Sequence, residues 1–209
     1  MAKKAAAAAR YDVHPSVAMV QKWTAELPAK TGRSLDEWAE LVRRAPLATN
    51  AEKRDWLKRE YGHGTNTAWW IVEYSQGSAT WDGDPGQYLK SAAGYVDAMF
   101  AAKGKEWQRP VFEAVVAFAR SLGPDVKVCP CKTIVPLYRN RVFAELKPAT
   151  KTRLELALVL GEVPFAGRLR VNPRAKGNDR LRHLIALTGE SDFDAAAKKW
   201  LAAAYKADG

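Results

Sequence analysis

Hydroxyl and cationic side chains converge in one short stretch of the sequence, Thr150-Lys151-Thr152-Arg153. Hydroxyl groups and cations that meet at the start of a strand can together bind an anion such as a phosphate. The stretch lacks the leading glycines of a phosphate-binding loop, so it does not predict a nucleotide-hydrolysing site. The alternative is a solvated connection whose basic side chains bind nothing.

The C-terminal half of the chain carries most of the positive charge. The whole chain has a net charge of +10, and residues 105–209 hold 19 Lys and Arg against 11 Asp and Glu, a local excess of 8. Such an excess favours polyanionic partners, of which nucleic acid is the main candidate. The alternative is that the chain is basic and soluble but binds no polyanion. The cations that we expect to bind nucleic acid or another anion are Arg139, Arg141, Lys151, Arg153, Arg168, Arg170, Arg174, Lys176, Arg180 and Arg182.

No set of residues has the spacing of a catalytic or metal-binding motif. The three histidines are scattered, and no serine or cysteine lies in a nucleophile context. Cys129-Pro130-Cys131 has one residue between its thiols, whereas paired zinc ligands are separated by two to four, so buried structural cysteines are expected. Glu145 and Glu155 lie on neighbouring predicted strands. They can pair with Arg141 and Arg153 across the sheet as readily as act as acid and base. We therefore predict a non-catalytic protein without a cofactor or a metal.

Aromatic residues offer a second kind of binding site. Exposed aromatic rings beside cations can stack on bases, and they can equally line an apolar pocket for a planar small molecule. The alternative function is therefore a small-molecule-binding or sequestering protein, with Trp70, Trp81 and Tyr138 in a pocket between the helical module and the sheet. The other six of the eight tryptophans fit apolar helical stripes and are expected in the core: Trp23, Trp38, Trp56, Trp69, Trp107 and Trp200.

An alternating run of leucines organises the C-terminal part of the chain. Leu154, Leu156, Leu158 and Leu160 fall on one side of an extended strand. We predict an α+β domain over residues 87–209, with a small, mainly antiparallel sheet flanked by helices. Its helices are expected at about 87–103, 106–122 and 193–205, and its strands at about 126–129, 133–138, 142–147, 153–160 and 184–187.

Residues 13–75 are predicted to form an all-α helical domain. Two capping boxes, Ser34 with Glu37 and Thr49 with Glu52, start two of its helices. In each box the hydroxyl accepts a hydrogen bond from an amide inside the first turn, and the glutamate accepts one from the amide of the capping residue. This reciprocity makes both helix starts specific predictions.

Two segments are expected to lie outside the domains. Residues 1–12 are predicted to be a disordered tail, and residues 76–86, rich in Gly, Ser and Asp, a linker. Pro28 is predicted to kink or end the first helix. The alanines near the N-terminus are too few and too weakly apolar for a signal peptide, and no stretch is apolar enough to cross a membrane. With two cysteines in the chain, these features predict a cytoplasmic protein.

Two groups of motifs resemble known domains. Residues 30–38 (KTGRSLDEW), 55–58 (DWLK) and 62–64 (GHG) resemble a small helical bacterial domain of unknown function. Residues 143–144 (FA) and 148–156 (PATKTRLEL) resemble a second uncharacterised domain that often follows the first. Together, the two resemblances cover roughly residues 13–74 and 107–206.

The resemblance implies a small α+β C-terminal domain. Relatives of this domain look to be attached to restriction-type nucleases, which favours nucleic acid as a partner. The resemblance implies no catalytic residues. The chain departs from the family at residues 131–134 (CKTI), where a Lys-Lys-x-Tyr pattern is expected.

Overall fold

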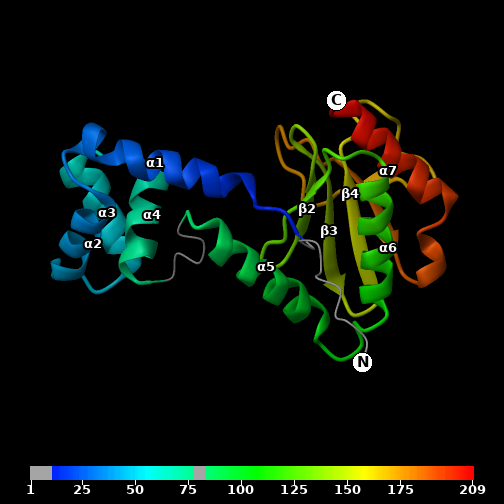
Figure 1. Ribbon diagram of the computed structural model, residues 1–209, viewed down its shortest axis with the longest axis horizontal. Helices are drawn as coiled ribbons and strands as arrows, with labels where there is room; N and C mark the ends of the chain where they lie inside the picture. The colour runs from blue at the N-terminus through cyan, green and yellow to red at the C-terminus, as the bar shows by residue number, and fades with distance from the viewer. Residues whose placement is uncertain (1–10, 78–82) are drawn as a thin grey trace, which may run out of the picture. The chain divides into compact units, whose positions relative to one another are not determined.

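The computed structural model of the protein describes residues 11–77 and 83–209. The chain divides into two compact units, which are described separately below. The helical unit is Pro15–Tyr88, and the sheet unit combines Leu89–Gly209 with the segment that ends at His14. Helices make up the first unit, and an antiparallel sheet with helices makes up the second (Figure 1). The prediction of an α+β protein is therefore confirmed. No helix among the described residues is both long and apolar enough to cross a bilayer.

Two helices of the helical unit begin at the predicted capping boxes. The Ser34 hydroxyl accepts from the backbone N–H of Glu37 at 3.2 Å, and the Glu37 carboxylate accepts from the N–H of Ser34 at 2.7 Å. Thr49 and Glu52 make the same pair of bonds at the next helix. Each box satisfies two amides that would otherwise have no partner, and this fixes the first turn. The helices described are α1 (Pro15–Thr31), α2 (Leu35–Arg44), α3 (Asn50–Tyr61) and α4 (Thr65–Ser75).

Helix α1 continues past Pro28, where the sequence predicts a kink or an end. Proline inside a helix removes one N–H donor and crowds the carbonyl four residues earlier. Here the helix ends soon afterwards, at Thr31, whose hydroxyl donates to the Leu27 carbonyl at 2.8 Å. The N–H of Gly32 also donates to the Pro28 carbonyl at 2.8 Å. The proline is therefore confined to a last turn that other hydrogen bonds hold.

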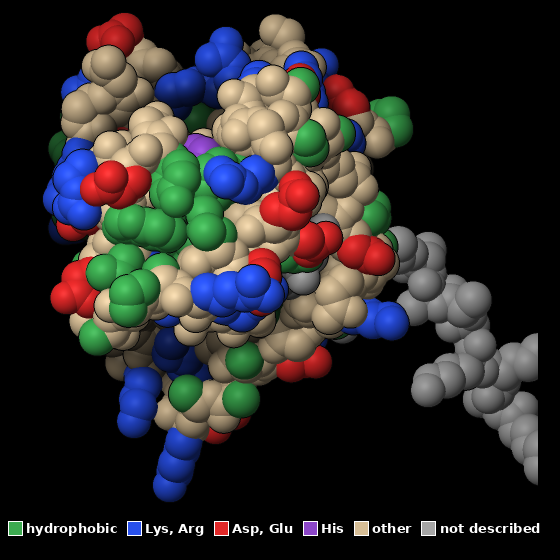
Figure 2. Space-filling model, turned by 90° about the vertical axis from the view of Figure 1, so that its left-hand side faces the viewer, with side chains coloured by type: hydrophobic (Ala, Val, Ile, Leu, Met, Phe, Trp, Pro, Cys, Tyr) green, Lys and Arg blue, Asp and Glu red, His purple; other side chains and the backbone are tan. Residues whose placement is uncertain are grey.

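Aromatic residues close the core of the helical unit around Trp38. The Trp38 ring is 1% exposed and stands edge-on to Tyr61 and His63, with ring centroids 4.9 and 4.4 Å away. The Arg33 guanidinium lies 4.9 Å from the Trp38 ring centroid, a cation–π contact. Burial lowers the pKa of His63, so its imidazole is neutral at neutral pH. Figure 2 shows hydrophobic side chains gathered on one face of the molecule, with Lys, Arg, Asp and Glu side chains around them.

The sheet unit is built on a six-stranded antiparallel sheet with the order β1-β2-β3-β4-β6-β5. Leu154, Leu156 and Leu158, whose alternation predicts the central strand, are fully buried. Leu156 pairs with Leu146 on one neighbouring strand and with Ile185 on the other. The strands are β1 (Lys127–Val128), β2 (Val135–Tyr138), β3 (Val142–Thr150), β4 (Arg153–Leu158), β5 (Arg170–Val171) and β6 (His183–Leu187).

The sheet differs from the predicted elements at several strand ends and by one additional strand, and β2 begins at Val135 instead of residue 133. Strand β3 continues through Pro148, which pairs with Leu154, so the turn before β4 is tighter than expected. Strand β4 ends at Leu158 instead of residue 160. Strand β5, which pairs with β6, is not among the predicted strands. It has only two residues, and two residues are too few to show an alternating pattern in the sequence.

Three helices belong wholly or mainly to the sheet unit: α5 (Pro85–Phe100), α6 (Gln108–Ser121) and α7 (Ala195–Ala207). Helices α6 and α7 pack on one face of the sheet, where α7 contacts β3 and β4 (Figure 1). The Phe143 ring on β3 meets Tyr205 on α7 with centroids 5.7 Å apart. Helix α7 begins one residue after Asp194, whose carboxylate accepts from the N–H of Ala197 at 2.9 Å.

Tyr11 and Asp12 are part of the sheet unit, although the sequence places them in a disordered tail. Tyr11 is buried, and the Asp12 carboxylate accepts from Arg120 Nη2 and from the Val128 N–H, both at 2.8 Å. These bonds hold the segment before α1 beside β1. The rest of the predicted tail, residues 1–10, and residues 78–82 of the predicted linker lie outside the described residues.

Candidate functional site

The hairpin between β3 and β4 ends in a turn that the segment between α5 and α6 holds in place. Lys105 Nζ donates to the Pro148 carbonyl at 2.9 Å, and the indole N–H of Trp107 donates to the Lys151 carbonyl at 2.9 Å. The side-chain amide of Gln108, which is fully buried, donates to the Thr150 carbonyl at 2.6 Å. Three side chains thus satisfy carbonyls of the hairpin. The exposed side chains of the turn therefore project from a fixed backbone.

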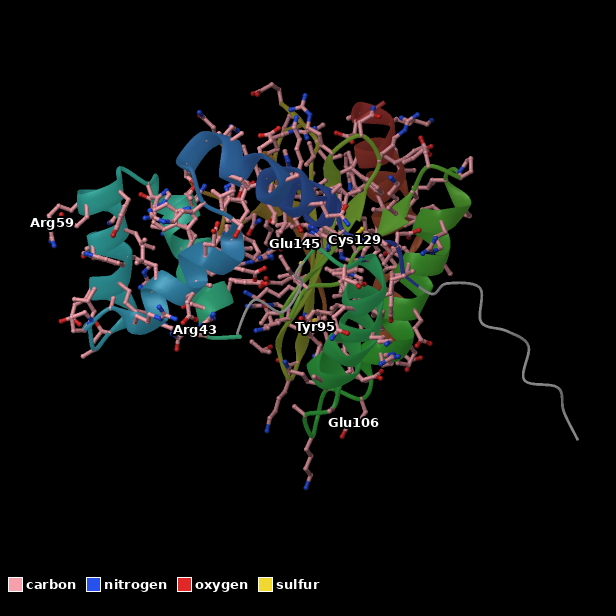
Figure 3. The ribbon with its side chains drawn as sticks, turned by 60° about the vertical axis from the view of Figure 1, so that its left-hand side comes forward. Arg43, Arg59, Tyr95, Glu106, Cys129 and Glu145 are labelled. Atoms are coloured by element: carbon pink, nitrogen blue, oxygen red, sulfur yellow. The ribbon has the colours of Figure 1, made fainter. Side chains whose placement is uncertain are left out.

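Cations from two distant segments gather at this turn. Gly104 packs against the side chain of Lys151: a Cβ at position 104 would lie 3.4 Å from Lys151 Cδ. The carboxylate of Glu106 accepts from the N–H of Gly104 at 2.7 Å, and Figure 3 shows Glu106 at one end of the sheet unit, away from Cys129 and Glu145. We call the cations of this turn the basic tip: Lys103, Lys105, Lys151 and Arg153.

The basic tip presents hydroxyl and cationic side chains together. Lys151 is exposed between Thr150 and Thr152, whose hydroxyl oxygens lie 3.3 Å apart. Arg153 forms an ion pair with Glu155 at 3.1 Å, but its side chain remains 46% exposed. Lysine, arginine and threonine side chains are frequent contacts of phosphate oxygens. The structure therefore brings two predicted site residues, Lys151 and Arg153, together with two cations from a segment more than 40 positions earlier.

The other predicted cations do not share this surface. Arg141 directly precedes β3 and Lys151 directly follows it, so the length of a nine-residue strand, about 30 Å, separates the two residues. Arg139 pairs with Asp125 at 2.8 Å, and its guanidinium lies 4.3 Å from the ring centroid of Tyr205. Arg139 and Arg141 therefore lie at the opposite end of β3 from the basic tip.

Carboxylates also hold two arginines of the segment before β6. Arg180 pairs with Asp208 at 2.8 Å, and Arg168 pairs with Asp194 at 2.8 Å. Arg170, Lys176 and Arg182 are exposed, and no ion pair involves them within the described part of the chain. The sequence segment is basic, but ion pairs with distant acidic residues neutralise part of it.

Arg174 lies over the sheet and joins two buried carboxylates. Its Nη1 lies 2.7 Å from Glu145 Oε1 and its Nε lies 3.3 Å from Glu155 Oε2. Glu145 and Glu155 are only 8% and 4% exposed. The sequence suggested Arg141 as the partner of Glu145, but the partner is Arg174. Because a buried carboxylate is costly unless it is paired, Arg174 supports the sheet and is not available as a polyanion contact.

Tyr138 lies beside His14, 124 positions earlier, a contact that no local sequence pattern predicts. The Tyr138 hydroxyl and His14 Nε2 are 3.1 Å apart. Burial, and then the charges of the two cysteines and Glu145, raises the pKa of Tyr138 to about 12. Burial also raises the pKa of Cys131 to about 11 and lowers that of His14. At neutral pH the phenol and the thiol are protonated and the imidazole is neutral, so this group of residues holds no activated nucleophile.

The aromatic groove that the structure describes lies inside the helical unit. Two adjoining hollows of about 220 and 180 Å³ share Val20, Trp23 and Trp70. Tyr74 also lines the larger hollow, and its hydroxyl donates to Asp36 Oδ1 at 2.8 Å.

Of the three aromatic residues predicted to share a pocket between the helical module and the sheet, only Trp70 lines this groove. Tyr138 belongs to the sheet unit, and Trp81 lies outside the described residues. The predicted set is therefore replaced by Trp23 of α1 and by Trp70 and Tyr74 of α4, which line the same groove.

Comparison with known proteins identifies both parts of the chain. Residues 19–77 match the family model of a domain of unknown function, DUF4287. Residues 96–208, more than half of the chain, match the family model described as Domain of unknown function (DUF5655). No curated protein and no solved structure matches the chain. The resemblance to two uncharacterised domains in this order is thus confirmed, and the chain belongs to the DUF5655 family, with a DUF4287 domain preceding the family domain.

Proposed function

We propose that this protein binds nucleic acid without catalysis and that the basic tip of the sheet unit contacts the phosphate backbone. The observation that carries the proposal is the gathering of Lys105, Lys151 and Arg153 around one fixed hairpin turn, with Lys103 next in the chain to Gly104, which packs on Lys151. The proposed contacts are to phosphates, which are the same in every sequence. We therefore expect little sequence preference and an affinity that falls steeply with salt. We also propose a cytoplasmic location, which agrees with two unpaired cysteines.

Reversing two charges of the basic tip is expected to weaken binding to short DNA or RNA at least tenfold at low salt. The variant is Lys151→Glu with Arg153→Glu, and the readout is fluorescence anisotropy of labelled oligonucleotides. The matched control is Lys199→Glu with Lys206→Glu on α7, which changes the net charge equally at two exposed residues. Equal losses in the two variants would mean that net charge alone governs binding, and the basic tip would not be the interface.

A second candidate function is binding of a planar small molecule in the aromatic groove of the helical unit. Its support is the combination of Trp23, Trp70 and Tyr74 with the Asp36 carboxylate, which suits an aromatic cation. A planar cation such as proflavine is expected to quench tryptophan fluorescence saturably in high salt, and Asp36→Asn should weaken this binding about tenfold. Quenching that does not saturate would contradict this candidate. Equal quenching by naphthalene sulfonate, a planar anion, would also contradict it.

A further inference from the structure

Trp69 does not lie in the core, where the sequence places it. Its side chain is 43% exposed, whereas Trp38 in the same unit is 1% exposed. An exposed indole gives up much of the stabilisation that burial supplies, and its open part is available to contact a ligand. The ring is nevertheless oriented, because it stands edge-on to Trp70 with centroids 5.1 Å apart.

Trp69 lines a groove between α3 and α4. The groove has a volume of about 490 Å³, within the range of small-ligand sites. It shares only Asn66 with the aromatic groove described above. Its lining residues are Ala51, Arg54, Asp55 and Lys58 from α3, and Thr65, Asn66 and Trp69 from α4.

The groove combines an aromatic face with cations and hydrogen-bonding groups. A base can stack on an exposed indole whatever its identity, because every base has a π face. Asp55 and Lys58 pair with each other at 2.5 Å. Arg54 makes no ion pair among the described residues, which leaves its guanidinium available for a phosphate. The Asn66 amide can both donate to and accept from a base edge.

We propose that this groove binds one nucleotide of a single strand, with the base stacked on Trp69 and the phosphate beside Arg54. The nature of the ligand rests on the proposed function, but the site lies in the other unit of the chain. Bases inside a duplex are already stacked on their neighbours and do not offer a face to a side chain. The groove therefore adds a preference for single strands that phosphate contacts at the basic tip do not supply.

The test compares single-stranded and duplex binding of the full chain. Trp69→Leu should bind labelled oligothymidylate about tenfold more weakly and bind a duplex of equal length as the wild type does. Trp69→Phe should retain binding to both, because phenylalanine keeps an aromatic face. Arg54→Gln should also weaken single-strand binding. Thermal melting verifies that the variants fold, which is expected because Trp69 is exposed.

A second readout separates this site from the basic tip. Adenosine 5′-monophosphate in high salt should quench the fluorescence of the wild type saturably and that of Trp69→Leu much less. If Trp69→Leu keeps both single-strand binding and saturable quenching, the stacking site is wrong even where the basic-tip variant loses binding. If the basic-tip variant binds normally while Trp69→Leu does not, the stacking site stands and the proposed role of the tip fails. If the wild type binds neither form and shows no quenching, both proposals are overturned.

Discussion

Replacing Arg174 with methionine is expected to lower the free energy of unfolding of the sheet unit by about 3–5 kcal/mol. The substitution removes the guanidinium that lies 2.7 Å from Glu145 and 3.3 Å from Glu155. Both glutamates are at most 8% exposed, so little water is available to replace the lost partner. Glu155 keeps its ion pair with Arg153, which places the expected loss nearer the lower limit. Urea unfolding followed by far-ultraviolet circular dichroism measures the change.

The control for this substitution is Arg170→Met on the neighbouring part of the sheet. Arg170 is exposed, so its loss should change the stability by less than about 0.5 kcal/mol. Combining Arg174→Met with Glu145→Gln and Glu155→Gln should recover most of the loss, because the unpaired charges are then absent. Unchanged stability of Arg174→Met alone would show that both carboxylates reach water and that Arg174 does not stabilise the sheet.

Replacing Asp208 with asparagine is expected to destabilise the protein by about 2–4 kcal/mol at neutral pH. The Asp208 carboxylate pairs with Arg180 at 2.8 Å and accepts from the backbone N–H of Arg141 at 2.7 Å. Asparagine keeps the shape but loses the negative charge that pairs with Arg180. Its NH2 group also replaces one of the two oxygens that accept from Arg180 and from the Arg141 N–H. The exposed residue Glu190 supplies the matched control, and Glu190→Gln should be nearly neutral.

The effect of Asp208→Asn should also depend on pH. Burial by itself would raise the pKa of Asp208, but hydrogen bonds from Arg180 and from the Arg141 amide outweigh it, and the pKa is lowered. The unfolded chain therefore binds a proton more readily than the folded protein does. The contribution of Asp208 is present above the unfolded value of about 3.9 and is lost as the pH falls through the folded value. The difference between wild type and variant should shrink below about pH 4, and a constant difference from pH 7 to pH 3 would contradict this account.

Local features of the chain were predictable from the sequence alone. The capping boxes at Ser34 and Thr49 depend on residues three positions apart, so they form wherever the helix forms. The alternation of Leu154, Leu156 and Leu158 identifies a strand because only an extended chain puts such residues on one face.

The candidate site could be predicted only in part, because side-chain partners come from distant segments. Arg139, Arg174 and Arg180 look available in the sequence, and each meets a carboxylate from another part of the chain. Conversely, Lys105 joins the basic tip only because its Nζ bonds to the Pro148 carbonyl, 43 positions away. A local sequence pattern shows neither which carboxylate pairs with a given arginine nor which distant segment a lysine reaches.

The exposure of Trp69 could not be predicted from the sequence for a different reason. An apolar stripe at helical spacing predicts burial only when another element covers that stripe. Trp69 and Trp70 are adjacent, so they point in directions about 100° apart on α4 and cannot both face the same neighbour. The sequence does not decide which of the two is covered, and the structure leaves Trp69 the more exposed.

The salt dependence of DNA binding tests the central claim most directly. Each phosphate that a cation neutralises contributes about 0.9 to the magnitude of the slope of log K against log salt concentration. For the wild type we predict a steep negative slope on short duplex DNA. Neutralising the tip with Lys151→Gln and Arg153→Gln should reduce the magnitude of that slope by about 1 to 2, while Lys199→Gln with Lys206→Gln should leave it unchanged. A wild type that does not bind DNA at low salt, or a slope that the tip substitutions do not alter, would contradict the account.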